Sequence, residues 1–595
     1  MAFQYKAPQR DMQFVMHDVL GLESLYASLP KFADTNRELI DSVVEAGAQF
    51  CEGELAPINR SGDEEGCTFD NGVVTTPKGF KEAYAKYVEL GFGALAAEPE
   101  HGGQGLPPTV GVAMSEMMGT ANWSFGMYPG LSHGAINTLE EHGTPEQKEV
   151  YLTKLISGEW TGTMCLTEPH AGSDLGIIRT KAEPNADGSY AITGTKIFIS
   201  AGEHDLADNI VHIVLARLPD APKGTKGISL FIVPKFMPSG ERNTVACGSI
   251  EHKMGIKASA TCVMNFDAAK GFLIGPPNRG LNCMFTFMNT ARIGTAVQGL
   301  AAAEGSFQGA LEYARDRLAM RALTGPANPE KEADPIIVHP AVRQMLMTQK
   351  AFAEGGRLLC YWLSTQNDIV QGSTDEEARK KADELLSFLT PIAKAFLTEV
   401  GYESANHGVQ VYGGHGFIRE WGMEQIVRDT RIALLYEGTT QIQALDLLGR
   451  KVLQTQGAML RNFTKIVHKF CEAEAGNAAM AEFTGPLSAL NKEWGDLTMR
   501  IGMKAMQNPN EAGAAAVDYM MYSGYVTLGY LWAWMAKVAQ DKIAAGEGNT
   551  AFYEAKIKTA QFYFKKILPR TKGHVDIIDG GVDVLMQMDA ESFAF

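Results

Sequence analysis

The sequence predicts a mainly helical protein with one central antiparallel β domain and a further helical domain at its C-terminal end. Three observations lead to this fold class. Apolar residues recur at helical spacing over most of the chain, while β-type runs are confined to residues 161–272. At 595 residues, the chain is also about four times the length of an ordinary domain. We therefore expect several packed units rather than one core.

The first 160 residues are expected to be helical. Residues 1–34 are predicted to form an N-terminal extension and residues 35–160 a helical domain. This domain opens after the capping candidates Asp34 and Thr35 with apolar residues on one helical face. Asp11 and Asp18 precede any long apolar run, which is unlike a signal or transit peptide. We therefore expect the protein to stay in the cytoplasm.

Residues 161–275 are expected to form the β domain. Runs rich in β-branched and aromatic residues begin near Ala191, Ile210, Ile228 and Cys262. The step Asp187-Gly188 is typical of a hairpin turn. No helix-length segment separates these runs, and parallel strands would need such connections. The spacing therefore favours an antiparallel domain.

Residues 280–456 predict a helix bundle with short connections, and residues 470–595 predict an extra C-terminal helical domain. Long amphipathic helices are expected within 340–365 and 376–407. The most apolar segment of the C-terminal domain, residues 514–536, contains Asp518. A carboxylate in mid-span is expensive in lipid, so we expect a buried helix there and no stable membrane insertion.

Charge and cysteine usage exclude several function classes. The chain holds 53 Lys+Arg against 69 Asp+Glu, a net charge of -16, which disfavours nucleic acid as a partner. Residues 471–595 carry 11 Lys+Arg and 15 Asp+Glu, a net -4, so this domain has no basic face for DNA. Eight scattered cysteines form no CxxC or Cys/His pattern, so we expect neither a metal site nor a disulfide framework.

Three short strings carry the functional information. They are Met164-Cys-Leu-Thr-Glu-Pro-His-Ala-Gly-Ser-Asp174, Gln410-Val-Tyr-Gly-Gly-His-Gly-Phe417 and Leu435-Tyr-Glu-Gly-Thr-Thr-Gln-Ile-Gln443. In this order, flanking a β domain, they resemble the acyl-CoA dehydrogenase family of flavoproteins over residues 35–455. The C-terminal domain is similar to that of a long bacterial subgroup, which includes 3-methylmercaptopropionyl-CoA dehydrogenases.

The resemblance implies an architecture and a set of partners. The family's fold is a helical domain, a β-barrel-like domain and a four-helix bundle. Its cofactor is FAD, which lies between subunits, so a homodimer is expected. The electrons pass on to electron-transferring flavoprotein. By analogy alone, the extra C-terminal domain covers the face that shorter members use to form tetramers.

Glu437 is the candidate catalytic base. Removing the α-proton of a thioester requires a nearby base, and a carboxylate in a dry apolar pocket gains basicity. Glu437 follows the apolar residues Ala433–Leu435, although the residues alone leave open that it caps a helix start. By resemblance, Glu437 matches the family's catalytic glutamate. Some members carry the base on an earlier helix, where this chain has no acid near Asn289–Arg292.

The resemblance assigns flavin contacts to five segments of the chain. A Pro- and Gly-rich loop can point backbone N–H groups and hydroxyls at a flavin, although a plain polar turn is the alternative. A second flavin segment departs from the family's motif, because the usual Trp-Ile-Thr is replaced here by Phe198-Ile199-Ser200. The alternative for this segment is an ordinary β-strand with no role in flavin binding. The expected cofactor contacts are Met164, Leu166, Thr167 and Ser173, then Phe198, Ile199 and Ser200, then Arg317, Gln410, Gly413 and Gly414, and finally Thr439 and Gln441.

Some of these assignments leave alternatives open. Arg317 could pair with a phosphate or be a surface helix charge, and Arg315 and Arg321 are close in sequence. His170 stands where the family has Gly and is expected on the loop surface. The expected substrate contacts are Ser173, Asn289 and Arg292. For Arg292, the alternative is a purely structural salt bridge. Met284–Met288 could line an acyl channel or fill the core.

The expected reaction is α,β-dehydrogenation of an acyl-CoA thioester to the trans-2-enoyl-CoA. Glu437 would take the α-proton while the β-hydrogen leaves as hydride to flavin N5. In the family, the flavin ribityl chain and the Glu437 backbone N–H bind the thioester oxygen. Fatty-acid β-oxidation of medium or long chains is favoured. A 3-methylmercaptopropionyl-CoA dehydrogenase, an acyl-CoA oxidase and a DNA-associated flavoprotein of the same superfamily are the alternatives.

Overall fold

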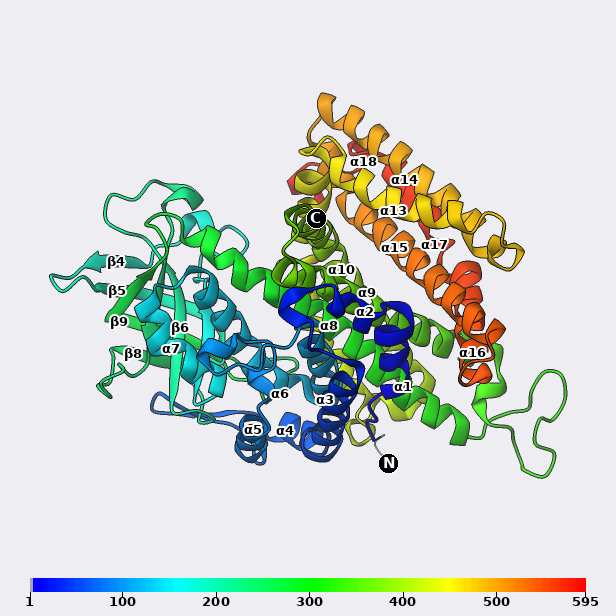
Figure 1. Cartoon of the computed structure of the whole chain (residues 1–595), viewed down its shortest axis with the longest axis horizontal. Coiled ribbons are helices and arrows are strands. Elements are labelled where there is room, and N and C mark those ends of the chain that lie inside the picture. The colour runs from blue at the N-terminus through cyan, green and yellow to red at the C-terminus, as the bar shows by residue number, and fades with distance from the viewer. Residues whose placement is uncertain (1–3, 595) are drawn as a thin grey trace. The chain divides into compact units, whose positions relative to one another are not determined.

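The computed structural model describes residues 4–594, which pack as two units (Figure 1). The β-containing unit comprises Gln4–Ala7 and Glu38–Gly294, and the helical unit comprises Pro8–Arg37 and the chain from Thr295 onward. The predicted fold class, mainly helical with a central sheet and extra C-terminal helices, is confirmed.

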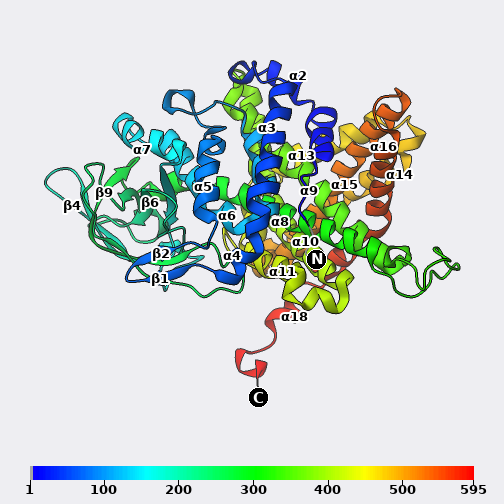
Figure 2. The ribbon, with the colours of Figure 1, turned by 90° about the horizontal axis from the view of Figure 1, so that it is seen from below.

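Helices form the first part of the β-containing unit. They are α3 (Arg37–Phe50), α4 (Asn59–Glu65), α5 (Phe80–Glu89), α6 (Pro108–His142) and α7 (Pro145–Ser157). A small hairpin, β1 (Thr68–Asp70) with β2 (Val73–Thr75), lies between α4 and α5 in the chain (Figure 2). The buried Tyr128 of α6 fastens this helix to a loop, because its hydroxyl donates to the Ala258 carbonyl and accepts from the Ala260 N–H, both at 3.0 Å.

A seven-stranded sheet forms the rest of this unit. Its main path runs β3-β6-β7-β9-β5-β4, and β8 pairs with β9. The strands are β3 (Trp160–Cys165), β4 (Lys181–Pro184), β5 (Tyr190–Ser200), β6 (Asn209–Ala216), β7 (Ser229–Pro234), β8 (Val245–Ile250) and β9 (Thr261–Ile274). Strand β6 is buried along its whole length, which explains why its residues other than Asn209 and His212 are apolar without alternation.

One strand pair departs from the antiparallel prediction. Strand β3 pairs with β6 in parallel, whereas every other strand pair in this sheet is antiparallel. A parallel pair needs a long connection, but that connection need not be a helix. Here β4 and β5 lie between β3 and β6 in the chain, and they form an antiparallel pair across the predicted Asp187-Gly188 turn.

The helical unit contains the predicted bundle and the extra C-terminal helices. Its bundle helices are α8 (Gly280–Asp316, from Thr295 onward), α9 (Pro340–Gly372), α10 (Glu376–Tyr412), α11 (Met423–Arg431) and α12 (Thr440–Leu445). Two short helices, α1 (Gln9–Gln13) and α2 (Leu22–Ala27), come from the N-terminal part of the chain. Long helices therefore occupy both segments, 340–365 and 376–407, where the sequence predicts them.

The C-terminal helices include the most apolar segment of the chain. They are α13 (Ala458–Ala473), α14 (Ala481–Gln507), α15 (Asn510–Ala544), α16 (Thr550–Phe562), α17 (Arg570–Asp579) and α18 (Asp583–Met586). Helices α13, α14 and α15 lie side by side (Figure 1). The predicted buried helix is confirmed, because most residues of α15 from Tyr519 to Ala536 are buried. Over residues 4–594, no helix combines the length and apolarity needed to cross a membrane.

A buried ion network ties sequence-distant helices of this unit together. Asp11 of α1 binds both Arg357 of α9 and Lys556 of α16. Arg357 also reaches Glu304 of α8, and Lys556 reaches Glu354 of α9, each at 2.8 Å. Burial alone would raise the pKa of Asp11, but the charges of Lys556 and Arg357 outweigh it and lower that pKa to about 2. The Asp11 carboxylate therefore stays ionised inside the fold.

Candidate active site

Glu437 lies in a strained turn of the helical unit, just before α12. Its backbone φ is +57°, in the left-handed region that residues other than glycine seldom adopt, and φ of the next residue, Gly438, is +85°. Such a conformation costs on the order of 1–3 kcal/mol and persists only where surrounding contacts enforce it. The Glu437 side chain is partly buried.

Four side-chain hydrogen bonds hold this turn in place. The Tyr436 hydroxyl donates to Gln298 Oε1 at 2.5 Å, and the Thr440 hydroxyl donates to Glu399 Oε1 at 2.6 Å. The backbone between these two residues is bound as well. Gln443 Nε2 donates to the Glu437 carbonyl at 3.1 Å, and Lys394 Nζ donates to the Gly438 carbonyl at 2.5 Å. Both donors are completely buried, so they are fixed in the core of the unit.

The N-cap of α12 is Thr439, not Glu437. Thr439 Oγ1 accepts a hydrogen bond from the Ile442 N–H at 3.2 Å, as an N-cap threonine does. The N-cap position of α12 is therefore filled by Thr439, two residues after Glu437. Gln441 lies exposed in the first turn of the same helix.

In the β-containing unit, the structure brings the first predicted flavin loop beside β5. The Ile197 N–H donates to the Thr167 carbonyl at 2.9 Å, and the Thr163 hydroxyl donates to the Ser200 carbonyl at 2.5 Å. Met164, Leu166 and Thr167 therefore neighbour the segment Phe198–Ser200. Thr167 and Ser200 are both partly exposed.

A buried ion pair organises this loop, and sequence reasoning missed it. Lys196 Nζ lies 2.9 Å from both Glu168 Oε1 and the Leu166 carbonyl, and both charged side chains are buried. Glu168 also accepts hydrogen bonds from Arg179 and Thr180. Burial raises the pKa of Glu168, but Lys196 and these donors outweigh it, so the pKa is lowered. The available signal was two opposite charges, one inside the first string and one two residues before the segment Phe198–Ser200.

Strand β5 is interrupted at Phe198. The register between β5 and β9 shifts between Lys196 and Ile199, and Phe198 has a φ of +58°. A bulge of this kind re-aims side chains. Phe198 is 60% exposed, whereas Ile199 is buried in the core. Phe198 therefore presents an aromatic face, while the side chain of Ile199 belongs to the sheet and leaves only its backbone for a ligand.

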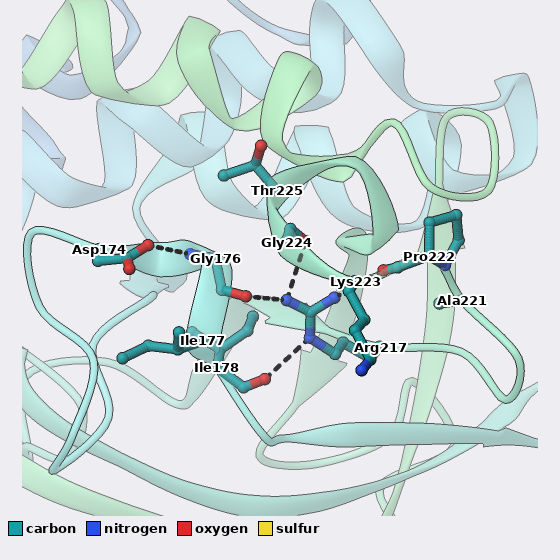
Figure 3. A pocket seen from close by; sticks show the side chains of 10 residues that line it. All are labelled: Asp174, Gly176, Ile177, Ile178, Arg217, Ala221, Pro222, Lys223, Gly224 and Thr225. Atoms are coloured by element: carbon teal, nitrogen blue, oxygen red, sulfur yellow. Dashed lines mark hydrogen bonds between the residues drawn. The ribbon is translucent and has the colours of Figure 1, made fainter.

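The end of the first loop lies beside an open pocket in the β-containing unit. Ser173 is exposed, and the next residue, Asp174, lines the pocket together with Lys223 and Thr225 (Figure 3). Arg217 shapes the pocket, because its guanidinium donates to four backbone carbonyls, those of Gly176, Ile178, Pro222 and Gly224. His170 is exposed on the same loop, as expected.

The predicted substrate residues of α8 lie together. Arg292 Nη1 is 3.4 Å from Asn289 Oδ1, and Asn289 is exposed. The neighbouring Thr290 accepts a hydrogen bond from Asn137 of α6 at 3.0 Å. Met284 is fully buried, so the alternative in which it fills the core holds for this residue.

In the helical unit, the second string joins the end of α8. The Tyr313 hydroxyl lies 2.9 Å from His415 Nδ1, and the Tyr313 and Tyr412 rings stack with centroids 4.1 Å apart. Trp421 stacks on His415 at 4.3 Å. This aromatic cluster, which sequence reasoning missed, places the string near the chain that continues from Tyr313 to Arg317. Arg317, Gln410, Gly413 and Gly414 are all exposed, and a Cβ added at either glycine would meet nothing within 4 Å.

Family models match four successive parts of the chain. The N-terminal, middle and C-terminal domain models of acyl-CoA dehydrogenases match residues 37–159, 163–269 and 278–453. A further model, acetyl-CoA dehydrogenase C-terminal like, matches residues 463–589. The chain belongs to the acyl-CoA dehydrogenase family. Acyl-CoA dehydrogenases are FAD-dependent oxidoreductases, so the predicted family, enzyme class and cofactor are confirmed.

Two relatives match this acyl-CoA dehydrogenase over nearly their whole length. The 3-methylmercaptopropionyl-CoA dehydrogenase of Ruegeria pomeroyi is 43% identical, over 98% of this chain and 99% of that protein. The broad-specificity linear acyl-CoA dehydrogenase FadE5 of Mycobacterium tuberculosis is 34% identical, over 99% of this chain and all of that protein. A solved structure of an acyl-CoA dehydrogenase from Bacillus anthracis, complexed with FAD, shares the fold with a TM-score of 0.75 at 22% identity. It covers 92% of this chain and 88% of that chain.

Proposed function

We propose that the protein oxidises an acyl-CoA thioester to the trans-2-enoyl-CoA, with Glu437 as the base that removes the α-proton. The observation that carries this proposal is the enforced turn at Glu437. Four side-chain hydrogen bonds hold a glutamate in a left-handed conformation that it would not adopt alone. Stored backbone strain of this kind is a recurrent feature of catalytic residues.

Each residue of the turn has a separate role in this proposal. The Glu437 carboxylate accepts the α-proton, and the Glu437 backbone N–H donates to the thioester oxygen, which stabilises the charge that develops as the proton leaves. Gln443 and Lys394 occupy the carbonyls of Glu437 and Gly438 and keep both peptide groups from turning. Reorganisation at the moment of reaction is thereby avoided.

The residues assigned to FAD fit that cofactor chemically. Phe198 offers an exposed aromatic face, and the partly exposed Thr167 and Ser200 offer hydroxyl groups. Gly413 and Gly414 leave room for close backbone approach, and Arg317 offers a cation for phosphate. We propose that these residues, with Met164, Leu166, Ser173, Ile199, Gln410, Thr439 and Gln441, hold the cofactor. Bound FAD supplies the acceptor for the β-hydrogen and its electron pair.

We propose 3-methylmercaptopropionyl-CoA as a substrate, ahead of the medium- and long-chain acyl-CoAs favoured by the sequence alone. The relative named for that substrate is 43% identical over nearly the whole chain, whereas the relative named for linear acyl-CoAs is 34% identical. We also propose that Ser173, Asn289 and Arg292 contact the acyl-CoA. Asn289 and Arg292 are neighbours on α8, and Ser173 is exposed beside the pocket of Arg217.

The partners and location are likewise proposals. We propose a homodimer that passes its electrons to electron-transferring flavoprotein, as the family resemblance implies. A cytoplasmic location is supported by the cysteines, because all eight are free thiols and seven of them are buried. An oxidase would instead pass electrons to oxygen, so peroxide formation in air without an added acceptor distinguishes that rival.

Anaerobic reduction of the bound flavin tests the proposed reaction. The purified holoprotein would be mixed with acyl-CoAs from three to eighteen carbons and with 3-methylmercaptopropionyl-CoA, and bleaching of the flavin absorbance would be recorded. We expect 3-methylmercaptopropionyl-CoA to bleach the flavin fastest. Acetyl-CoA is the matched control, because it has an α-carbon but no β-carbon and cannot be desaturated. If no member of the panel bleaches the flavin, the proposed function is wrong.

A further inference from the structure

Lys394 is a buried cation that lies against the turn of Glu437. It belongs to α10, its side chain has no exposed surface, and its Nζ donates to the Gly438 carbonyl at 2.5 Å. An ammonium group in a protein interior is costly unless it is hydrogen-bonded, so a buried lysine holds firmly to its acceptors. The Gly438 carbonyl is therefore bound by a charged donor in the interior of the unit.

The Gly438 carbonyl, which accepts this hydrogen bond, belongs to a turn whose backbone conformation is unfavourable. Glu437 and Gly438 are consecutive residues with positive φ, so their backbone has alternatives of lower energy. The peptide group after Glu437 is bound by Gln443, and the peptide group after Gly438 is bound by Lys394. Without the Lys394 hydrogen bond, the turn keeps the hydrogen bond from Gln443, but the peptide group that leads into α12 is free to rotate.

We propose that Lys394 is a positioning residue for the Glu437 base. By fixing the Gly438 carbonyl, Lys394 keeps the left-handed turn formed and the Glu437 carboxylate aimed at the α-carbon of the substrate. This inference rests on the proposed function of Glu437. Lys394 does not act on the substrate itself, and its effect on the rate passes entirely through the turn.

Proton abstraction is sensitive to such positioning. A displacement of about 1 Å in a reacting group can lower a rate on the order of 100-fold, even when the altered residue lies away from the chemistry. Binding of the CoA moiety depends on many other contacts and is affected far less. A positioning role therefore predicts a loss in kcat without a matching change in KM.

The test is Lys394→Met, which keeps the length and apolar stem of the side chain and removes its ammonium. We expect kcat to fall about 10- to 100-fold, with KM within about threefold of the wild-type value and FAD still bound. We also expect the exchange of the α-proton of acetyl-CoA with deuterated solvent to slow by a similar factor. Lys394→Arg restores a charged donor and should recover part of the loss in kcat.

Lys556→Met is the matched control. Lys556 is equally buried in the same unit but pairs with Asp11 and Glu354 on α1 and α9. Its substitution should lower thermal stability while leaving kcat per bound flavin unchanged. A loss of kcat in both variants would identify a general effect of removing a buried charge and would overturn the proposal.

Two other outcomes would also overturn it. One is a Lys394→Met holoprotein with kcat and α-proton exchange within about twofold of wild type. The other is a variant in which KM rises by the same factor as kcat falls. If Lys394→Met does not fold, Lys394→Gln takes its place with the same expectations. A Glu437→Gln enzyme that keeps its activity would instead refute the proposed base, so the two failures are distinguishable.

Discussion

Glu437 and Gly438 form the turn to which the proposed chemistry is assigned. A glutamate with a φ of +57° is unfavourable by itself, and the following glycine is required for two reasons. Its φ of +85° suits only glycine, and a Cβ at this position would lie 2.4 Å from Nε2 of Gln443. The contact between Gln443 and the Glu437 carbonyl therefore depends on the absence of a side chain at Gly438.

Gly438→Ala tests this requirement. We expect a loss of about 1–3 kcal/mol in the free energy of unfolding, since the added methyl group is strained and displaces Gln443. We also expect a lower kcat, because the carbonyl of Glu437 loses its donor. Denaturant unfolding and steady-state kinetics measure the two effects.

Gly495→Ala is the control for Gly438→Ala. Gly495 is exposed within α14, no proline follows it, and a Cβ there would meet nothing within 4 Å. Alanine should therefore stabilise the helix by about 0.5–1 kcal/mol. Equal effects of the two substitutions would contradict the account of Gly438.

The proposed base could be predicted from the sequence, but the residues that hold it could not. Glu437 could be predicted as the base because it lies in a short recognisable string with apolar neighbours. Lys394 is 43 positions earlier, in an ordinary helical segment, and nothing in that segment marks it as buried against a carbonyl. The pair Glu168 and Lys196 was missed for the same reason, since tertiary contacts decide which charges become buried partners.

At the scale of elements, the long helices were predictable and one strand pairing was not. Helices α9, α10 and α15 follow from periodic apolar residues over many turns. The parallel pairing of β3 with β6 depends on where β4 and β5 carry the chain, and local sequence does not encode that path. The bulge at Phe198 likewise arises from pairing with β9.

The loop after β5 makes the β-containing unit sensitive to acid. His204 is fully buried; its Nδ1 accepts from the Leu206 N–H at 3.1 Å, and its Nε2 lies 2.9 Å from the Thr161 hydroxyl. The first of these bonds requires an unprotonated Nδ1. Burial, helped by the charge of Lys235, lowers the pKa of His204 to about 3, and burial lowers the pKa of His212 to about 3 as well.

These depressed pKa values predict a loss of stability as the pH falls below about 6.5. In that range, the unfolded chain binds protons at His204 and His212 while the folded protein does not, so protonation favours unfolding. At pH 5, the expected loss is about 2 kcal/mol for each histidine, relative to pH 8. Thermal unfolding followed across this range measures it.

His204→Asn isolates the contribution of one histidine. The asparagine oxygen can replace Nδ1 as the acceptor for Leu206 but cannot be protonated in this range. The variant should be less stable than wild type at pH 8, because it loses the bond to Thr161, and should show a smaller loss on acidification. An unchanged pH dependence would contradict the assignment of His204 as a buried neutral group.

At the scale of the whole molecule, composition and pattern predicted the class of protein but not its internal connections. The net charge of -16 pointed away from nucleic acid, and the resemblance carried by the three strings implied an acyl-CoA dehydrogenase. The network that joins Asp11, Arg357 and Lys556 spans up to 545 residues of sequence within one unit. No local pattern pairs residues at that separation, so such contacts are visible only in the structure.

The central claim is that Glu437 removes the α-proton, and the rate of anaerobic flavin reduction in Glu437→Gln tests it most directly. The amide keeps the size of the side chain and removes its basicity. With saturating 3-methylmercaptopropionyl-CoA, or the best substrate of the panel, we predict that bleaching slows about 100- to 10,000-fold while FAD and acyl-CoA binding are retained. Bleaching within about tenfold of the wild-type rate would contradict the account and place the base elsewhere.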